Sequence, residues 1–189
     1  MTRGYDATIE SKSMSTSTEI RKTVYASLFA ALIAVGAFIS VPVGPVPIVL
    51  QNFFVLLAGL TLGPRWGLLS VAAYLVTGAV GLPVFAQGTG GIGRLLGPTG
   101  GYLLGYLPAV ATVGAISHIR KKRWYLDLGG AICGSLIVYA CGVPWLKMVA
   151  GMTWEAAAGA GMLPFLVGDA VKIAAAVWVV RVIRPAFRV

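Results

Sequence analysis

The chain has 189 residues, of which 58% are hydrophobic and only 11% are charged, and its mean hydropathy is +0.86. A soluble globular domain of this length would need far more polar surface, so the composition excludes that class. The apolar runs are continuous and do not alternate with polar residues, which excludes a transmembrane β-barrel. The sequence therefore predicts an all-α integral membrane protein in contact with lipid. The net charge of +9 does not indicate a nucleic-acid partner, because the basic residues lie beside the ends of the predicted helices.

A polar tail and six apolar segments divide the chain. Residues 1–20 are rich in Ser and Thr and are predicted to form a disordered tail. Residues 21–189 are predicted to form one transmembrane domain, in which each apolar segment crosses the bilayer as a helix. The six predicted helices cover residues 22–40, 48–62, 66–82, 101–116, 128–146 and 162–182. Gly63-Pro64-Arg65 is predicted as a turn between the second and third helices, and residues 147–160 are predicted as an outer loop.

Six helices place both termini on the same side of the membrane. The basic residues beside the helix ends are strongly biased to one side, ten against two. Because cytoplasmic loops carry the excess of Lys and Arg, both termini are predicted to be cytoplasmic and residues 81–102 to face outward. The ten are Arg21, Lys22, Arg65, Arg120, Lys121, Lys122, Arg123, Arg181, Arg184 and Arg188, and the two are Arg94 and Lys147.

The first predicted helix carries small residues at close helical spacing, namely Ser27, Ala30, Ala31 and Ala34. Such a strip lets another helix approach closely, which would suit a surface that docks a partner. Alanine is also common in membrane helices, so both interpretations stay open.

The connection to the second helix contains three prolines between residues 41 and 47, and a helix cannot continue through them, so an ordered outer loop is predicted. The second helix then opens with Gln51 and Asn52. These amides need polar partners at that depth, and capping of the helix and contact with a ligand explain them equally well.

The segment 81–102 is the most unusual part of the sequence, because eight of its 22 residues are glycine. Irregular backbone at membrane depth is tolerated only where it lines a cavity or is buried in protein. Two nucleotide-binding motifs are nearly matched, but residues 88–93 follow no strand, and Arg94-Leu95 stands where a P-loop requires Lys-Ser or Lys-Thr. The chain therefore has no predicted nucleotide site, and ATP could drive it only through partners.

The last predicted helix carries two ionisable residues well inside its apolar span, Asp169 and Lys172. A spacing of three residues puts both on one helix face. An ion at that depth costs on the order of 3 kcal/mol unless something solvates it, so the pair predicts a polar cavity. A salt bridge that only holds two helices together is the structural alternative.

The chemistry of such a cavity suits a small solute with an anionic end and a polar neutral end. Lys172 can meet a carboxylate or a carbonyl oxygen, and Asp169 can accept from N–H groups. Tyr102 and Trp145 can cover apolar portions of the solute. No Ser/His/Asp set, metal-ligand cluster or pair of carboxylates converges in the sequence, so neither an enzyme nor a cofactor is predicted.

Five sequence motifs together carry a specific resemblance to a known family. They are PVPIVLQ at 45–51, LLAGLTLGP at 56–64, GLPVFA at 81–86, GGIGRLLGPTGGYLLG at 90–105 and PFLVGDAVK at 164–172. The chain closely resembles the BioY family, the biotin-binding S components of energy-coupling-factor (ECF) transporters. The resemblance covers nearly everything from Tyr25 to Ile183, and the combination of GPTGGY with GDxxK makes it specific.

The resemblance implies the six-helix S-component fold, with both termini cytoplasmic, in the inner (plasma) membrane of a prokaryote. It implies capture of biotin from outside, with biotin as transported ligand and no cofactor. The implied partners are an ECF transmembrane coupling subunit and two ATPase subunits, and the strip around Ala30 resembles the family's docking surface. A solitary biotin carrier that works without the ATPase module is the alternative.

The resemblance also implies a ligand site within residues 21–189. Asp169 and Lys172 resemble the family's ligand-contacting pair and Tyr102 its aromatic contact, while Thr89 stands where related sequences place Asn or Ser. The sequence leaves open whether Lys172 meets the carboxylate of biotin or shares its ureido ring with Asp169. The predicted ligand-binding residues are Asp169, Lys172, Tyr102, Thr89, Gly90, Gly91, Gln51 and Trp145.

Overall fold

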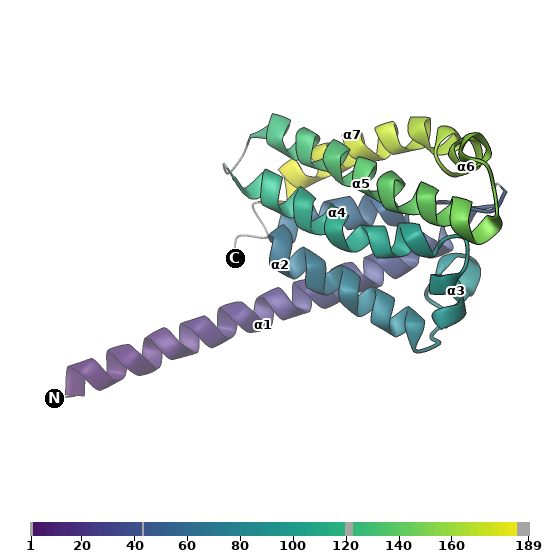
Figure 1. The fold of residues 1–189 in the computed structure, drawn as a ribbon. Coiled ribbons are helices and arrows are strands. Elements are labelled where there is room, and N and C mark those ends of the chain that lie inside the picture. Colours follow the sequence, from purple (N-terminus) through teal and green to yellow (C-terminus); the bar gives the residue numbers. More distant parts are fainter. Residues whose placement is uncertain (1, 43, 120–122, 185–189) are drawn as a thin grey trace.

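The protein is almost entirely helical in the computed structural model, which describes residues 2–42, 44–119 and 123–184, with side chains from Thr18 onward (Figure 1). Two very short strands, β1 and β2, pair in antiparallel fashion between the first two long helices. In chain order the elements are α1 (Thr2–Phe38), β1 (Ser40–Val41), β2 (Ile48–Val49), α2 (Gln51–Ala79), η1 (Ala86–Gly88), α3 (Ile92–Leu96), α4 (Gly100–His118), α5 (Trp124–Ala150), α6 (Trp154–Gly161), η2 (Leu163–Phe165) and α7 (Leu166–Ile183).

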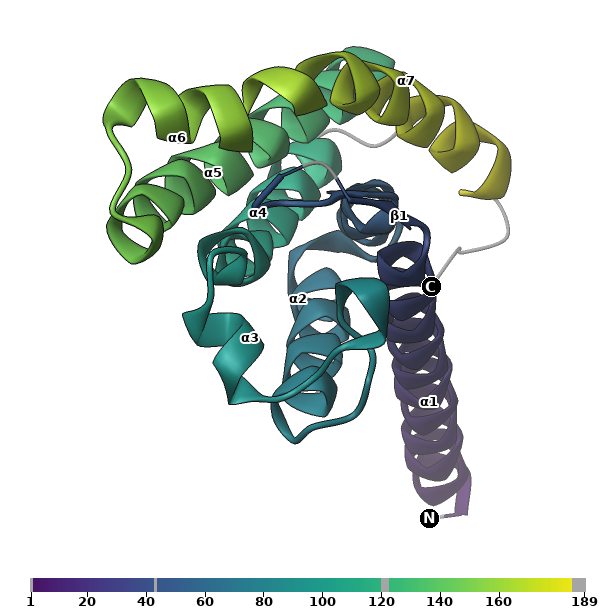
Figure 2. The ribbon, with the colours of Figure 1, turned by 90° about the vertical axis from the view of Figure 1, so that its right-hand side faces the viewer.

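Helix α4 occupies the middle of the bundle, between α2 and α5 (Figure 2). Helix α1 packs on α2, and α7 crosses the far side, where it contacts both α2 and α5. Apolar side chains such as Leu56, Val110 and Val113 are fully buried between these helices. The helices thus pack around a single apolar core. Their exposed outer faces carry further apolar residues that suit contact with lipid.

The chain reverses inside α2, at Gly63. Its backbone has φ 79° and ψ −176°, a conformation that glycine adopts at little cost. A Cβ added to Gly67 would lie 3.3 Å from the Cα of Gly59, although eight residues of straight helix span about 12 Å. The two halves of α2 therefore lie side by side, which confirms the predicted turn. Five described helical segments are long and apolar enough to cross a membrane, and the reversal in α2 gives the six predicted ones.

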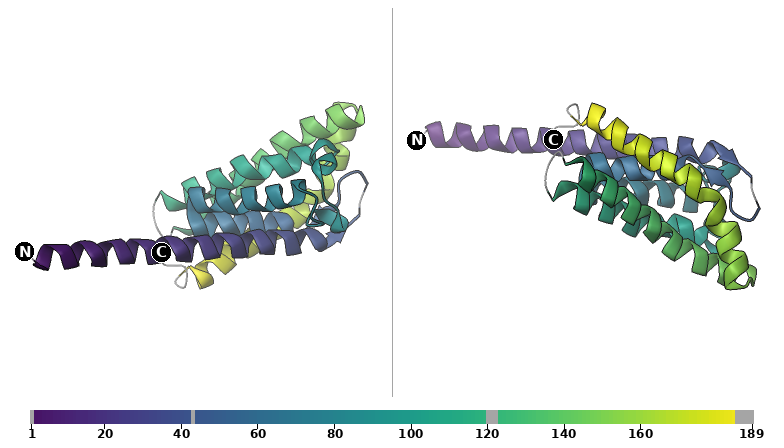
Figure 3. Two further views of the ribbon diagram at one scale, coloured as in Figure 1. Left: turned by 90° about the horizontal axis from the view of Figure 1, so that it is seen from below. Right: turned by 90° about the horizontal axis from the view of Figure 1, so that it is seen from above.

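The two ends of the bundle differ in what they carry (Figures 1 and 3). One end, called here the inner end, holds the last turn of α4, the first turn of α5 and the end of α7, and the N-terminal arm of α1 leaves from it. The opposite, outer end holds the β1–β2 pair, η1, α3 and α6. The glycine-rich segment and the start of α7 therefore share one end, as the sequence predicts. Of the ten basic residues predicted for the inner side, Arg120, Lys121, Lys122 and Arg188 lie outside the described residues.

The N-terminal arm differs from the expectation. The sequence predicts a disordered tail over residues 1–20, whereas the structure has helical backbone from Thr2 as part of α1. No proline precedes Pro42, so nothing in the sequence forces the helix to start later. The arm projects beyond the bundle as a single helix (Figure 3).

Two connections at the outer end are more ordered than a loop. Residues 147–160 are predicted as a loop, but α5 continues to Ala150 and α6 begins at Trp154. Thr153 caps α6 by accepting from the backbone N–H of Ala156 at 3.3 Å, and the alanine-rich sequence that follows favours a helix. The described part of the proline-rich segment is ordered as predicted, with Ser40 opposite Val49. It is called the strap below and comprises β1, β2 and residues 44–47.

Candidate functional site

An ion pair at the start of α7 forms the centre of the candidate site. Lys172 Nζ lies 3.0 Å from Asp169 Oδ1, and the two side chains are only 13% and 10% exposed. The hydroxyl of Tyr139, on α5, donates to the second carboxylate oxygen of Asp169. Asp169 lies in the first turn of α7, where the partial positive charge of a helix N-terminus favours a carboxylate. The charges predicted from the sequence therefore have polar partners inside the apolar bundle.

A cavity of about 50 Å³, called here the pair cavity, opens beside these residues. Its polar wall is formed by Asp169, Lys172, Tyr139 and Asn52, which come from three different helices. Its remaining wall is apolar and aromatic, a combination typical of sites that bind small organic molecules. The other lining residues are Val46, Pro47, Val49, Tyr102, Tyr106, Val138 and Phe165.

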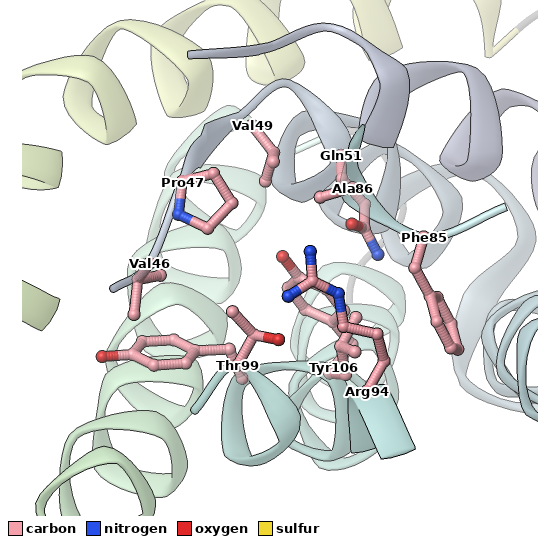
Figure 4. A pocket seen from close by; sticks show the side chains of 11 residues that line it. Val46, Pro47, Val49, Gln51, Phe85, Ala86, Arg94, Thr99 and Tyr106 are labelled. Atoms are coloured by element: carbon pink, nitrogen blue, oxygen red, sulfur yellow. The ribbon is translucent and has the colours of Figure 1, made fainter. Parts of the chain in front are cut away.

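A second cavity, of about 40 Å³, adjoins the first. Arg94 points into it toward Gln51 and Tyr106, and we call it the arginine cavity (Figure 4). The two cavities share part of the strap and two tyrosine rings, so they are neighbouring parts of one site. The shared residues are Val46, Pro47, Val49, Tyr102 and Tyr106, and the arginine cavity adds Phe85, Ala86, Thr99 and Leu103.

Two amides at the start of α2 have unused hydrogen-bonding atoms at these walls. Gln51 and Asn52 are 2% and 6% exposed. The Oδ1 of Asn52 has no hydrogen-bond partner among the described residues, and the Nε2 of Gln51 has only the neighbouring Tyr74 hydroxyl, with which it forms no well-aligned hydrogen bond. A buried polar atom left without a partner costs roughly 1–3 kcal/mol. A polar ligand in the cavities could supply the missing hydrogen bonds, so the geometry favours ligand contact as the role of the two amides.

The structure brings together four of the eight predicted ligand-binding residues. Asp169, Lys172 and Tyr102 line the pair cavity, and Gln51 lines the arginine cavity. The ring of Tyr102 faces both cavities, while its hydroxyl is used elsewhere, because it donates to the carbonyl oxygen of Gly161 at 2.8 Å.

The other four line neither of the two cavities in this structure. Thr89 accepts a hydrogen bond from the Arg94 side chain, and the backbone N–H of Gly91, next to Gly90, donates to Gly78 at 2.7 Å. Trp145 donates from Nε1 to the carbonyl oxygen of Gly97 at 2.9 Å. All four shape the glycine-rich segment, and direct contact of Thr89, Gly90, Gly91 and Trp145 with a ligand remains a prediction.

Several residues of the site are not identified by the sequence alone. Tyr106 and Tyr139 stand in long apolar runs, where a tyrosine cannot be told from a core aromatic. Arg94 counts there only as one of the flanking charges of the outer side. Phe165 carries no polar signal at all. A lone arginine within a glycine-rich segment at membrane depth is the one signal that could have revealed Arg94.

Comparisons with known proteins identify the family of the chain. The sequence model of the BioY family matches residues 10–189. The chain belongs to the BioY family. It is 47% identical over 151 residues to the probable biotin transporter BioY of Pyrococcus horikoshii, with 80% of this chain and 88% of that protein covered. It is 42% identical over 158 residues to the biotin transporter BioY of Thermotoga maritima, covering 83% and 92%.

A solved structure gives the same result for the fold of this BioY-family chain. The crystal structure at 2.1 Å of the S component for biotin from an ECF-type ABC transporter matches with a TM-score of 0.82 and 30% sequence identity. The match covers 89% of this chain and 93% of that one. The protein is therefore a multi-pass membrane protein with the S-component fold. Its family consists of transport components and not of enzymes, in agreement with the sequence prediction.

Proposed function

We propose that this chain captures biotin from outside the cell and is the substrate-binding S component of an ECF-type vitamin importer. The observation that carries the proposal is the nearly buried Asp169–Lys172 pair, which faces a cavity with unsatisfied amides beside it. An ion pair that only held helices together would need neither the cavity nor the amides. Relatives named biotin transporters support the choice of ligand.

The two cavities suit the two ends of biotin. Asp169 and Lys172 already neutralise each other, so together they suit a neutral polar group such as the ureido ring. In that arrangement Asp169 accepts from ureido N–H and Lys172 donates to the carbonyl oxygen. The guanidinium of Arg94 donates to two neutral side chains, Thr89 and Gln87, so its positive charge suits the carboxylate of the acid chain.

The apolar part of biotin would lie between these two ends. The rings of Tyr102 and Tyr106 line both cavities, and Phe165 lines the pair cavity. Each cavity is smaller than biotin, so the ligand would have to join them. Outward movement of the strap would join the two cavities, because both are lined by its residues Val46, Pro47 and Val49.

The proposal includes the orientation and the partners. The excess of basic residues at the inner end favours a cytoplasmic location for both termini, in the inner membrane of a prokaryote. Because the chain lacks a nucleotide-binding motif, transport driven by ATP requires a coupling subunit and two ATPase subunits. On α1, Ser27 and Ala31 are exposed, whereas Ala30 and Ala34 partly pack on the core. The exposed half of the strip is where we place the docking of the coupling subunit.

Calorimetric titration of biotin into the purified detergent-solubilised protein tests the ligand and the site. We expect tight, saturable binding of one biotin per chain, and its loss in Lys172→Ala. Lys147→Ala is the matched control, because Lys147 is a lysine at the same end of the bundle that instead lies 5.1 Å over the ring of Trp154. Unchanged affinity in Lys172→Ala would rule out the assigned site, and no binding to folded wild-type protein would rule out biotin.

Uptake of labelled biotin tests the partners. Cells without their own biotin uptake would express this chain alone or with a coupling subunit and two ATPase subunits. We expect uptake only with the full set. Equal uptake by the chain alone would favour a solitary carrier, and the dependence on partners would then be wrong.

A further inference from the structure

A short series of hydrogen bonds holds the side chain of Arg94. Its Nε donates to Thr89 Oγ1 at 2.8 Å, and the Thr89 hydroxyl donates in turn to the carbonyl oxygen of Ala86 at 2.9 Å. Its Nη2 donates to Gln87 Oε1 at 3.4 Å. Neither contact uses Nη1, so the guanidinium keeps donors for the cavity into which it points (Figure 4).

The loop that supplies these acceptors is anchored to the bundle. Phe85 is 1% exposed, and its ring packs edge-on against Tyr74 with centroids 5.6 Å apart. The ring occupies the space over Gly78, where an added Cβ would come within 2.2 Å of it. The Phe85 N–H donates to the carbonyl oxygen of Thr89 at 2.8 Å and closes the loop. Within it Gln87 has a φ of 61°, a left-handed conformation that is uncommon for a residue other than glycine.

We infer that Thr89 acts as a positioning residue for Arg94, in place of the direct ligand contact that the sequence predicts for it, and that the held arginine selects ligands with a free carboxylate. Thr89 lines neither cavity, whereas Arg94 lines one. A long arginine side chain loses rotamer freedom when it binds, and fixing its Nε beforehand lowers that cost. The inference rests on the proposed function, because it takes biotin as the ligand and Arg94 as the contact of its carboxylate.

Threonine suits this task because one hydroxyl accepts from Arg94 and donates to Ala86 at the same time. Serine keeps that hydroxyl. Valine keeps the shape of threonine and has no hydroxyl. Thr89→Val and Thr89→Ser together therefore separate the hydrogen bonds from the packing of the loop.

The test compares the dissociation constants of biotin and of biotin methyl ester, which lacks the negative charge. Wild-type protein should prefer biotin by about 10-fold or more, and Arg94→Gln should lose this preference. Thr89→Val should weaken the binding of biotin about fivefold and the binding of the ester less than about twofold, while the affinities of Thr89→Ser should equal those of wild type. In the Arg94→Gln background, Thr89→Val should have no further effect on either ligand beyond about twofold.

The outcomes separate this inference from the proposed function. If wild-type protein binds neither ligand, the proposed function fails. The inference is wrong if wild-type protein binds both ligands but Thr89→Val weakens the binding of biotin and of the ester equally. It is also wrong if Thr89→Val has the same effect in the Arg94→Gln background. In either case Thr89 touches the ligand or only supports the fold. If Thr89→Val does not fold, Gln87→Leu provides the second reading. It removes the Arg94 Nη2 contact, and it should reduce the preference for the acid without weakening the ester.

Discussion

The bundle contains two ion pairs of the same chemistry at opposite ends, and both involve α7. At the outer end Lys172 pairs with Asp169, which also accepts from Tyr139. At the inner end Arg184 Nη2 lies 2.7 Å from Asp127 Oδ1, which also accepts from Ser117. In each case a carboxylate accepts from one cation and one hydroxyl.

The surroundings of the two pairs differ. Arg184 Nη2 also donates to Ser117 at 3.0 Å and to the carbonyl oxygen of Leu60 at 3.3 Å, so it ties the end of α7 to α2, α4 and α5. Asp127 is 1% exposed and lines neither described cavity, although its Oδ2 has no hydrogen-bond partner among the described residues. The outer pair instead lines a cavity, and the two unsatisfied amides lie at cavity walls. Vacant polar space next to an ion pair, more than the charges themselves, thus distinguishes a binding site from a structural contact.

The largest effect is expected from Asp169→Asn at the outer pair. The amide keeps the volume of the side chain, but it removes the charge that holds Lys172 and replaces one of the two acceptor oxygens with an NH2 donor, so Lys172 and Tyr139 can no longer each have an oxygen of their own. We expect biotin to bind at least about 100-fold more weakly, because hydrogen bonds to a buried charge are lost together. Calorimetry measures the affinity, and size-exclusion chromatography checks that the variant is folded. Binding within a few-fold of wild type would show that the outer pair is not the site.

Arg184→Met at the inner pair should have the opposite profile. It leaves the Asp127 carboxylate buried without its cation, and we expect a loss of stability of about 2 kcal/mol, since Arg184 is partly exposed. Thermal unfolding should show a midpoint several degrees lower, with biotin affinity within about twofold of wild type. Arg181→Met is the control, because Arg181 is exposed and its guanidinium stacks over Trp124 at 5.8 Å. Equal destabilisation by both variants would deny the inner pair a special role.

Tyr139→Phe should have an intermediate effect on binding. It removes one hydrogen bond to Asp169 and keeps the ring on the wall of the pair cavity. We expect biotin to bind about 10-fold more weakly in calorimetry, the usual value for one hydrogen bond to a charged group. An affinity equal to that of wild type would mean that Tyr139 does not orient the carboxylate.

Ser135→Ala should have the smallest effect. Ser135 lies on α5 one turn from Tyr139 and two turns from Asp127, and its buried hydroxyl has no partner among the described residues. Removing a buried hydroxyl that forms no hydrogen bond is close to neutral. Affinity should stay within about twofold and the unfolding midpoint within about 2 °C of wild type. A clear loss of either property would reveal a polar connection between the two pairs.

Hydropathy and spacing predict the features of the fold that depend on local sequence. The long apolar runs indicate the helices, and Gly63-Pro64-Arg65 indicates the reversal within α2. Two charges inside an apolar run identify Asp169 and Lys172, because such residues have no inexpensive place in a membrane except a polar site. The prediction of a loop over residues 147–160 is wrong because the capping threonine and the alanine-rich run there are weaker signals than the polar residues around them.

Pairings across the fold could not be predicted in the same way. Asp127 and Arg184 are separated by 57 residues, and Tyr139 and Asp169 by 30, so no local pattern indicates that they meet. In the sequence Arg184 resembles any other cation at a helix end. Arg94 is the clearest case, because its role depends on how the 85–91 loop folds around it.

The stabilisation of the protein by biotin tests the distinction between the two pairs most directly. A ligand that binds only the folded protein raises its stability by about 4 kcal/mol when its concentration is about 1,000 times the dissociation constant. Thermal unfolding would be measured with and without biotin for wild type, Lys172→Ala and Arg184→Met. We predict a clear upward shift for wild type, none for Lys172→Ala, and the same shift from a lower starting midpoint for Arg184→Met. A wild-type shift in Lys172→Ala, or its loss only in Arg184→Met, would contradict the placement of the ligand at the outer pair.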